Sequence, residues 1–272
     1  MEGILYICPT PIGNLDDITI RTLNILRSVD LIAAEDTRHT LKLLNHYEIK
    51  KPLTSYHEHN IREKGYYLIN QLKEGKNIAL VSDAGMPGIS DPGHDLIRLC
   101  IEEDIQVIGL PGPSASLLAL VVSGLDTSKF VFEGFLPSKK GDRKKALERL
   151  KDEKRTLIFY ESPHRIKDCI KDIYDVFGNR KVSLSRELTK HYEETIRGDI
   201  NYLLEVLSER DLKGEMILVV EGGHEVKEEF DIKSELEYFL SLGLSSKDAI
   251  KAVVDKTGLN KNEVYKESLL LK

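Results

Sequence analysis

The chain has 272 residues, which is long enough for two domains and a large hydrophobic core. With 41% hydrophobic and 31% charged residues, its composition is typical of a water-soluble globular protein. The net charge of -6 excludes a protein that coats nucleic acid over its whole surface, although a local basic patch can still bind it.

Membrane, secretion and metal signals are missing from the sequence. No apolar run reaches the ~18 residues of a membrane-spanning helix, and the first residues lack the pattern of a secretory signal. We therefore expect a cytoplasmic protein with no membrane partner. Cys8, Cys100 and Cys169 are odd in number and lack metal-ligand spacing, so we expect buried thiols, no disulfide framework and no metal site.

The first half of the chain alternates short apolar runs with helical patterns, as βαβ units do. The predicted strands cover residues 3–9, 31–37, 77–83 and 106–112. Asn60 and Glu63 form a predicted capping pair, and the Asp91-Pro92 and Gly112-Pro113 dipeptides predict helix starts. These signals predict an N-terminal α/β domain over residues 1–124 with one mostly parallel sheet.

The second half predicts another α/β domain of similar size, over residues 125–224. Its predicted strands cover residues 129–137, 155–162, 181–188 and 215–223. Its predicted helices cover residues 141–151, 163–177 and 199–210, with Ser162-Pro163 beginning the second of these and Gly178 ending it.

Residues 225–272 predict a third, small helical unit. Residues 224–237 are acidic and indicate a linker that runs into a helix. Two short helices follow around Gly258, and Asn260 with Glu263 caps the second. This spacing is typical of a helix-turn-helix, and it is equally compatible with a helical hairpin that packs on the body of the protein.

Three turns rich in glycine and proline directly follow predicted strands. They are "CPTPIGNLDD" (8–17), "SDAGMPGISDPG" (82–93) and "GLPGPSAS" (109–116). In an open parallel sheet, ligands bind outside the carboxyl ends of the strands. One such turn can be no more than a tight connection, but three together predict a small-molecule site. Neither G-x-G-x-x-G after the first strand nor a P-loop is present, so the sequence supports neither a dinucleotide fold nor a P-loop site.

Six sequence blocks, in this order, resemble the tetrapyrrole-methylase superfamily of S-adenosylmethionine-dependent enzymes. They are "YICPTPIGNLDDIT" (6–19), "AAEDTRHT" (33–40), "VSDAGMPGISDPG" (81–93), "GLPGPSA" (109–115), "FEGFLP" (132–137) and "YESPHR" (160–165). Within the superfamily they are similar to the branch that methylates the ribose 2'-hydroxyl of a cytidine in small-subunit ribosomal RNA. The turn over residues 8–17 departs from the G-x-G-P-G-D-P type of porphyrin-ring methylases, which favours RNA over a tetrapyrrole as substrate.

The resemblance implies two α/β domains with S-adenosyl-L-methionine in the cleft between them, and a homodimer. It also implies a set of cofactor contacts, at Pro9, Ser82, Asp83, Gly85, Met86, Ser114, Ala115 and Tyr160. Asp83 is expected to hold the ammonium or a hydroxyl group of the cofactor. The alternative is that Asp83 only binds the backbone of its own turn, as Asp often does.

Methylation of a ribose hydroxyl needs a base or a cation beside the oxygen that loses its proton. The segment "EDTRH" follows the second predicted strand, and we expect Glu35 or Asp36 to accept the proton and Arg38 to hold a phosphate. Polar groups of the second domain, such as Glu187 and Lys190, are further candidates. The alternative is that Glu35 and Arg38 form a salt bridge at a helix start.

Basic residues in several segments are candidate contacts to ribosomal RNA in the small ribosomal subunit. They are His57, Arg62, Lys139, Lys140, Arg143, Arg165 and Arg186. Residues 139–155 alone carry nine Lys or Arg and four Asp or Glu, a pattern that a solvated helix face also explains. Glu161 to Arg165 could equally cap a helix, and His57 could be a hydrogen-bonded surface histidine.

Two other functions compete with RNA methylation. One is a methyltransferase for a tetrapyrrole or another small molecule on the same scaffold. The other is a ligand-sensing regulator that binds DNA through its helix-turn-helix, but the "LLL" run at 269–271 indicates a helix that packs, rather than one that reads DNA.

Overall fold

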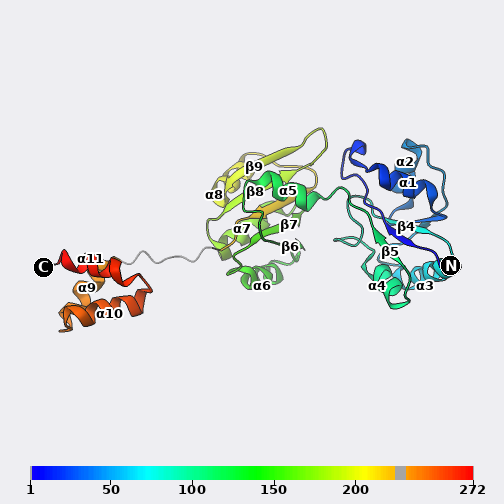
Figure 1. Ribbon diagram of the computed structural model, residues 1–272. Helices are drawn as coiled ribbons and strands as arrows, with labels where there is room; N and C mark the ends of the chain where they lie inside the picture. Colours follow the sequence, from blue (N-terminus) through cyan, green and yellow to red (C-terminus); the bar gives the residue numbers. More distant parts are fainter. Residues whose placement is uncertain (1, 224–230, 272) are drawn as a thin grey trace. The chain divides into compact units, whose positions relative to one another are not determined.

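The computed structural model describes residues 2–223 and 231–271, in two units (Figure 1). The first unit spans residues 1–223 and contains both sheets, and the second spans residues 224–272. The predicted linker over 224–230 lies outside the described residues. No helix in the described ranges is long and apolar enough to cross a membrane.

The first sheet is parallel throughout, in the order β3-β2-β4-β1-β5. Its strands are β1 (Leu5–Ile7), β2 (Leu31–Ala34), β3 (Leu53–Ser55), β4 (Ile78–Val81) and β5 (Val107–Gly109). The prediction of a mostly parallel sheet is confirmed. Only β3 was missed, because its three half-buried residues form no apolar run.

Helices cover both faces of this sheet, because alternate residues of its strands point to opposite sides. Leu31 and Ala33 pack with the helices on one face, while Ile32 and Ala34 pack with those on the other. The first face carries α3 (Ile61–Lys73) and α4 (His94–Glu102), and the second carries α1 (Ile20–Ser28) and α2 (Thr37–His46). A short 3-10 helix, η1 (Leu15–Asp17), follows β1.

The second sheet is mixed, in the order β6-β7-β10-β8-β9. Its strands are β6 (Phe130–Phe135), β7 (Thr156–Glu161), β8 (Lys181–Arg186), β9 (Glu194–Asp199) and β10 (Met216–Val220), and only β6 and β7 pair in parallel. β9 was missed because it is an edge strand whose one fully buried side chain is Ile196.

Helices also pack on both faces of the second sheet. The main core lies under α6 (Lys140–Leu150), α7 (Ile166–Phe177) and α8 (Ile200–Glu209). On the other face, α5 (Ala115–Ser123) buries Ala119 and Leu120 against Ile158 and Ile217. The helix α5 thus precedes the predicted domain boundary at residue 124 but packs on the second sheet, and the boundary itself stays a prediction.

Three predicted helix starts lie a few residues too early. α4 begins after Gly93, whose φ of 147° is not helical, and α5 and α7 begin after Ser114 and Arg165. Asn60 does precede α3, but its side-chain oxygen accepts a hydrogen bond from the His57 N–H (2.9 Å) and caps no helix. The predicted capping pair is therefore wrong, because the Asn60 side chain closes the preceding turn instead.

The second unit is a bundle of three helices, α9 (Ile232–Ser241), α10 (Ser246–Thr257) and α11 (Lys261–Leu269). Its own core contains Leu236, Ile250, Val253 and Val264. Gly258, with a φ of 67°, ends α10 in the left-handed conformation, and the Asn260 side chain accepts the Asn262 N–H (2.9 Å) at the start of α11. The predicted turn at Gly258 and the Asn260 cap are confirmed.

Candidate functional site

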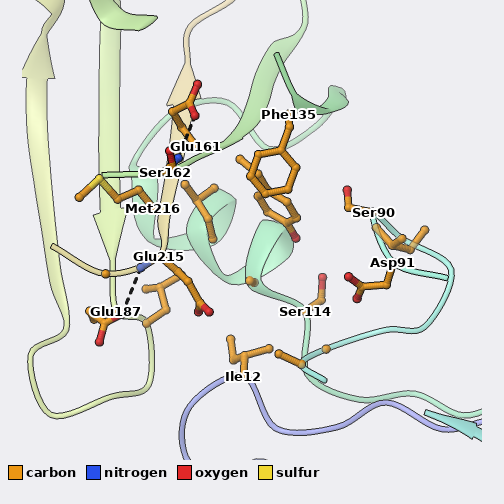
Figure 2. A pocket seen from close by; sticks show the side chains of 18 of the residues that line it. Ile12, Ser90, Asp91, Ser114, Phe135, Glu161, Ser162, Glu187, Glu215 and Met216 are labelled. Carbon is orange, nitrogen blue, oxygen red and sulfur yellow. Dashed lines mark hydrogen bonds between the residues drawn. The ribbon is translucent and has the colours of Figure 1, made fainter. Parts of the chain in front are cut away.

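A cavity of about 520 Å³ lies where the carboxyl ends of the first sheet meet the second sheet (Figure 2). The turns after β1, β4 and β5 form one wall. The ends of β6, β7, β8 and β10 form the other. The polar residues of its lining are Ser90, Asp91, Ser114, Tyr160, Glu161, Ser162, Glu187, Lys190 and Glu215.

The turns after β1 and β4 are joined by backbone hydrogen bonds. Thr10 and Gly85 exchange N–H to carbonyl bonds of 2.9 and 3.0 Å, and the Thr10 hydroxyl donates to the Ser82 carbonyl (3.0 Å). Gly85 has a φ of 80°, a conformation that favours glycine, and a Cβ there would lie 3.4 Å from Ile12. The glycine therefore keeps this wall thin, so that its backbone lies next to the cavity.

Five of the eight predicted cofactor contacts line this cavity, namely Gly85, Met86, Ser114, Ala115 and Tyr160. The other three lie close behind the wall. Pro9 packs against the β5 turn, where a Cβ on Gly112 would lie 2.6 Å from it. Ser82 is buried, and Asp83 lines a smaller neighbouring cavity of about 180 Å³. The roles of all eight stay predictions.

Acidic side chains join the turns that follow β2 and β4. The Asp83 N–H donates to the Glu35 carboxylate (3.4 Å), and the Asp36 N–H donates to the Asp83 carboxylate (3.1 Å). Glu35 has a raised pKa because burial disfavours its charged form and Asp83 lies nearby. Asp83 thus binds the backbone of the turn after β2 and not that of its own turn, which was the alternative, and its contact to the cofactor stays a prediction.

Asp36 caps α2 and pairs with Arg38. Its carboxylate accepts the Arg38 N–H (2.8 Å) and a guanidinium contact of 3.0 Å. Hydrogen bonds from the Arg38 side chain and backbone lower the pKa of Asp36 to about 2. Asp36 is therefore a weak proton acceptor, and the ion pair at this helix start involves Asp36 rather than Glu35. The Arg38 side chain is 88% exposed.

Asp91, which was predicted only as part of a helix start, lines the cavity. Burial raises the pKa of Asp91 to about 6, and the charges of Glu35 and Asp83 add to this rise. The neighbouring Ser82 side chain acts in the opposite direction and lowers the pKa. Its Asp-Pro dipeptide is a common helix-start pattern, so the local sequence carried no sign of this position. Its place in the same turn as Asp83 was the only available hint.

The opposite wall begins with aromatic residues and a buried carboxylate. Tyr160 makes edge-to-face contacts with Phe132 and Phe135, at ring-centre distances of 5.0 and 5.5 Å, and burial raises the pKa of its hydroxyl. Glu161 is buried, accepts the Ser162 N–H (2.8 Å) and pairs with Arg165 (3.2 Å). Arg165 also donates to the Leu136 carbonyl (2.6 Å), so its guanidinium is largely engaged within the protein.

The hairpin between β8 and β9 completes this wall. Lys190 donates to Glu187 (3.1 Å) and to Glu215 (3.0 Å), and Glu187 accepts the Glu215 N–H (3.1 Å). A Cβ on Gly13 would lie 2.4 Å from the Lys190 side chain, so the β1 turn packs directly on this hairpin. Glu187 and Lys190, which were further candidates, thus lie at the cavity.

The predicted RNA contacts do not form one cluster around the cavity. Arg62, Lys139 and Lys140 are exposed, whereas His57 is half-buried beside Asn60 and Arg186 pairs with Glu194 (2.7 Å). In the described residues, no group of three or more His, Cys, Asp or Glu side chains is arranged to hold a metal ion.

Arg143 contradicts its prediction as a surface contact to RNA. Its side chain is only 6% exposed, and it contacts the buried Asp172 carboxylate at 2.6 and 2.8 Å. Arg143 faces inward because α6 buries this residue and Leu147 against α7.

Comparison with known proteins agrees with this fold. The family model for tetrapyrrole (corrin/porphyrin) methylases matches residues 4–204. The chain is 50% identical over 271 residues to "Ribosomal RNA small subunit methyltransferase I" of Halalkalibacterium halodurans, covering 97% of this chain and 94% of the relative. It is 48% identical to the protein of that name from Bacillus subtilis, covering 97% and 93%.

Solved structures share the fold at low sequence identity. A cobalt precorrin-4 methyltransferase matches with a TM-score of 0.58 and 17% identity, over 80% of this chain and 94% of that one. A diphthine synthase matches with a TM-score of 0.61 and 13% identity, over 80% and 90%. The family match, the near-complete relatives and the shared fold together show that the chain belongs to the tetrapyrrole methylase family.

Proposed function

We propose that this protein transfers the methyl group of S-adenosylmethionine to the ribose 2'-hydroxyl of a cytidine in small-subunit ribosomal RNA. The observation that carries the proposal is the cavity walled by residues 84–91, within a chain 50% identical to a small-subunit ribosomal RNA methyltransferase. The solved methyltransferase structures of tetrapyrrole synthesis are only 17% identical and support the fold alone. The choice of the 2'-hydroxyl and of cytidine rests on the resemblance of the six sequence blocks.

The cavity residues fit S-adenosylmethionine, which has an adenosine part, an amino acid part and a positive sulfonium. A volume of about 520 Å³ lies in the ordinary range for small-molecule sites. The backbone at Gly85 can approach the ligand closely, and Ile12, Met86 and Met216 offer apolar contacts. Glu187 and Glu215 outnumber their partner Lys190 and bring net negative charge to a ligand whose net charge is positive.

When bound, the cofactor supplies an electrophilic methyl group. The protein must align the ribose oxygen with that group, and such positioning supplies a large part of the rate in many enzymes. The turns after β1, β4 and β5 are cross-linked by backbone hydrogen bonds and close packing, so they can hold a rigid site. Exposed cations such as Arg38, Lys139 and Lys140 can bind RNA phosphates.

The deciding experiment is transfer of a tritiated methyl group from S-adenosylmethionine to small ribosomal subunits that lack their native methylation. Nuclease digestion then locates the label. Label in a 2'-O-methylcytidine of the small-subunit RNA is the expected result. Wild-type protein that binds the cofactor but leaves both isolated RNA and subunits unlabelled would refute the proposal.

We also infer that two copies of the chain associate and that the protein acts in the cytoplasm, where its proposed substrate is assembled. The support for association is an apolar surface on α5. Leu117 and Val121 lie one helical turn apart and are 49% and 71% exposed.

A further inference from the structure

Three carboxylates gather where β2 and β4 end, and they differ in their access to the cavity. Asp91 lines the cavity, opposite the wall that carries Glu161 and Glu215 (Figure 2). Glu35 and Asp83 are absent from its lining as far as the described residues show. Of these three carboxylates, Asp91 is therefore the one that can meet a ligand in the cavity.

Glu35 and Asp83 are held in place by the backbone. Each accepts one N–H from the turn that carries the other, so the two side chains fasten the turns together. Their charges act on Asp91. Asp91 therefore binds a proton more readily than an isolated aspartate does, because like charges nearby disfavour its ionised form.

The groups that face Asp91 come from three elements. Glu35 follows β2, Asp83 and the Ser82 hydroxyl follow β4, and the Tyr160 hydroxyl comes from β7. Burial and the charges of Glu35 and Asp83 oppose ionisation of Asp91, whereas the neighbouring Ser82 side chain favours it. No cation acts on Asp91 among these groups, so its carboxylate is not committed to an ion pair as that of Asp36 is.

We propose that Asp91 is the proton acceptor of the methyl transfer, an inference that rests on the proposed function. Its carboxylate takes the proton of the ribose 2'-hydroxyl while the hydroxyl oxygen forms a bond to the methyl carbon. The bond between that carbon and sulfur breaks, and its electron pair stays on sulfur. The products are the methyl ether, a neutral thioether and a protonated Asp91, which then loses its proton to water.

The neighbouring carboxylates serve this step less well. Asp36 stays ionised because Arg38 pairs with its carboxylate, so Asp36 has little affinity for a proton. One carboxylate oxygen of Glu35 already accepts a hydrogen bond from the Asp83 N–H. A base works best when its pKa lies near the working pH, and the pKa of Asp91 is about 6.

The test compares full-length wild type with Asp91→Asn, which keeps the shape of the side chain but cannot act as a base. Asp104→Asn is the matched control, since Asp104 is exposed, lies just beyond α4 and has a φ of 56° that Asn adopts readily. Single-turnover methyl transfer to small subunits is measured from pH 5 to 9 at saturating cofactor. Cofactor affinity is measured separately by calorimetry.

We expect Asp91→Asn to slow methyl transfer by at least about a hundredfold, as for loss of a general base. Cofactor affinity should stay within about threefold of wild type. The wild-type rate should rise through pH 6 and then level off, whereas the slow rate of Asp91→Asn should lack this rise. In the cofactor-free protein, the part of the protonated-carboxyl infrared band that is lost near pH 6 in wild type should be missing from Asp91→Asn.

Two results would overturn the inference while the proposed function stands. One is an Asp91→Asn variant that methylates RNA at the wild-type rate. The other is a loss that saturating cofactor restores, which would make Asp91 a cofactor ligand. By contrast, a wild-type protein that labels no RNA refutes the proposed function itself, and the control variant should match wild type in every measurement.

Discussion

Asp91 illustrates at the scale of single residues how a site can cost stability. Its pKa of about 6 in the folded protein lies above the ordinary 3.8, so the folded state binds more protons than the unfolded chain between these values. Stability therefore falls as the pH rises from about 4 to about 6, and the loss persists at higher pH. A residue placed for packing alone would have no reason to carry this cost.

Replacing Asp91 by Asn should stabilise the protein above pH 6 and change little below pH 4. A shift of two pKa units corresponds to about 3 kcal/mol, and solvent screening at this half-buried side chain reduces the expected gain to about 1 kcal/mol. Urea unfolding at pH 4 and pH 8 measures the difference. Equal stability of the two proteins at pH 8 would contradict the inference that burial and the charges of Glu35 and Asp83 disfavour the ionised form of Asp91.

Arg143 should behave as a structural residue. Because Arg143→Ala leaves the Asp172 carboxylate buried without its closest partner, we expect a loss of about 3 kcal/mol in the free energy of unfolding. Lys140 and Lys144 lie 3.8 and 3.9 Å from Asp172 and limit the loss. Urea unfolding measures it, with exposed Lys145→Ala on the same helix as the control, for which we expect no significant change.

Among the elements, α6 combines this buried ion pair with an exposed basic surface. Lys139 and Lys140 lie at its start and are open to solvent. Changing both to Ala should weaken RNA binding for every sequence and lower the slope of log affinity against log salt by about one per lost phosphate contact. Filter binding at several salt concentrations measures the slope.

The control for this experiment is a pair of lysines at the end of the first sheet that lies away from the cavity. Lys73 ends α3 and Lys76 precedes β4, so both lie toward the amino ends of the strands, away from the cavity. Changing this pair to Ala removes the same net charge. An equal loss of affinity in both double variants would mean that α6 has no special role.

For the whole molecule, the separate core of the second unit predicts that the chain can be divided. Deleting residues 224–272 should leave cofactor affinity unchanged, because every residue that lines the cavity belongs to the first unit. RNA affinity should fall if these helices contact the substrate. Calorimetry with the cofactor and filter binding with RNA measure the two effects, and lost cofactor binding would contradict the division.

The exposed side of α5 predicts how copies of the chain associate. Changing both Leu117 and Val121 to Lys should convert a dimer into a monomer, because it places charge in an apolar contact. Light scattering during size-exclusion chromatography gives the mass. A dimer that survives both substitutions would place the contact elsewhere, and Tyr238→Lys in the second unit is the exposed control.

Sequence patterns alone were enough to identify eight of the ten strands in the described part of the chain and the parallel pairing of the first sheet. This succeeded because buried strands are continuous apolar runs, and glycine and proline mark the turns between them. β3 and β9 were not predicted because their sequences, LTS and ETIRGD, contain no continuous apolar run.

The sequence by itself determined the family through six blocks of resemblance, which also pointed to five residues of the cavity lining, and local patterns determined most of the order of the elements. Tertiary structure decided what the charged residues do. Asp36, Arg143 and Asp91 look alike in sequence as polar residues near helix starts, yet one caps a helix, one is buried in an ion pair and one faces the cavity. The pKa and availability of a charged group depend on which distant residues fold against it, and no local pattern records that.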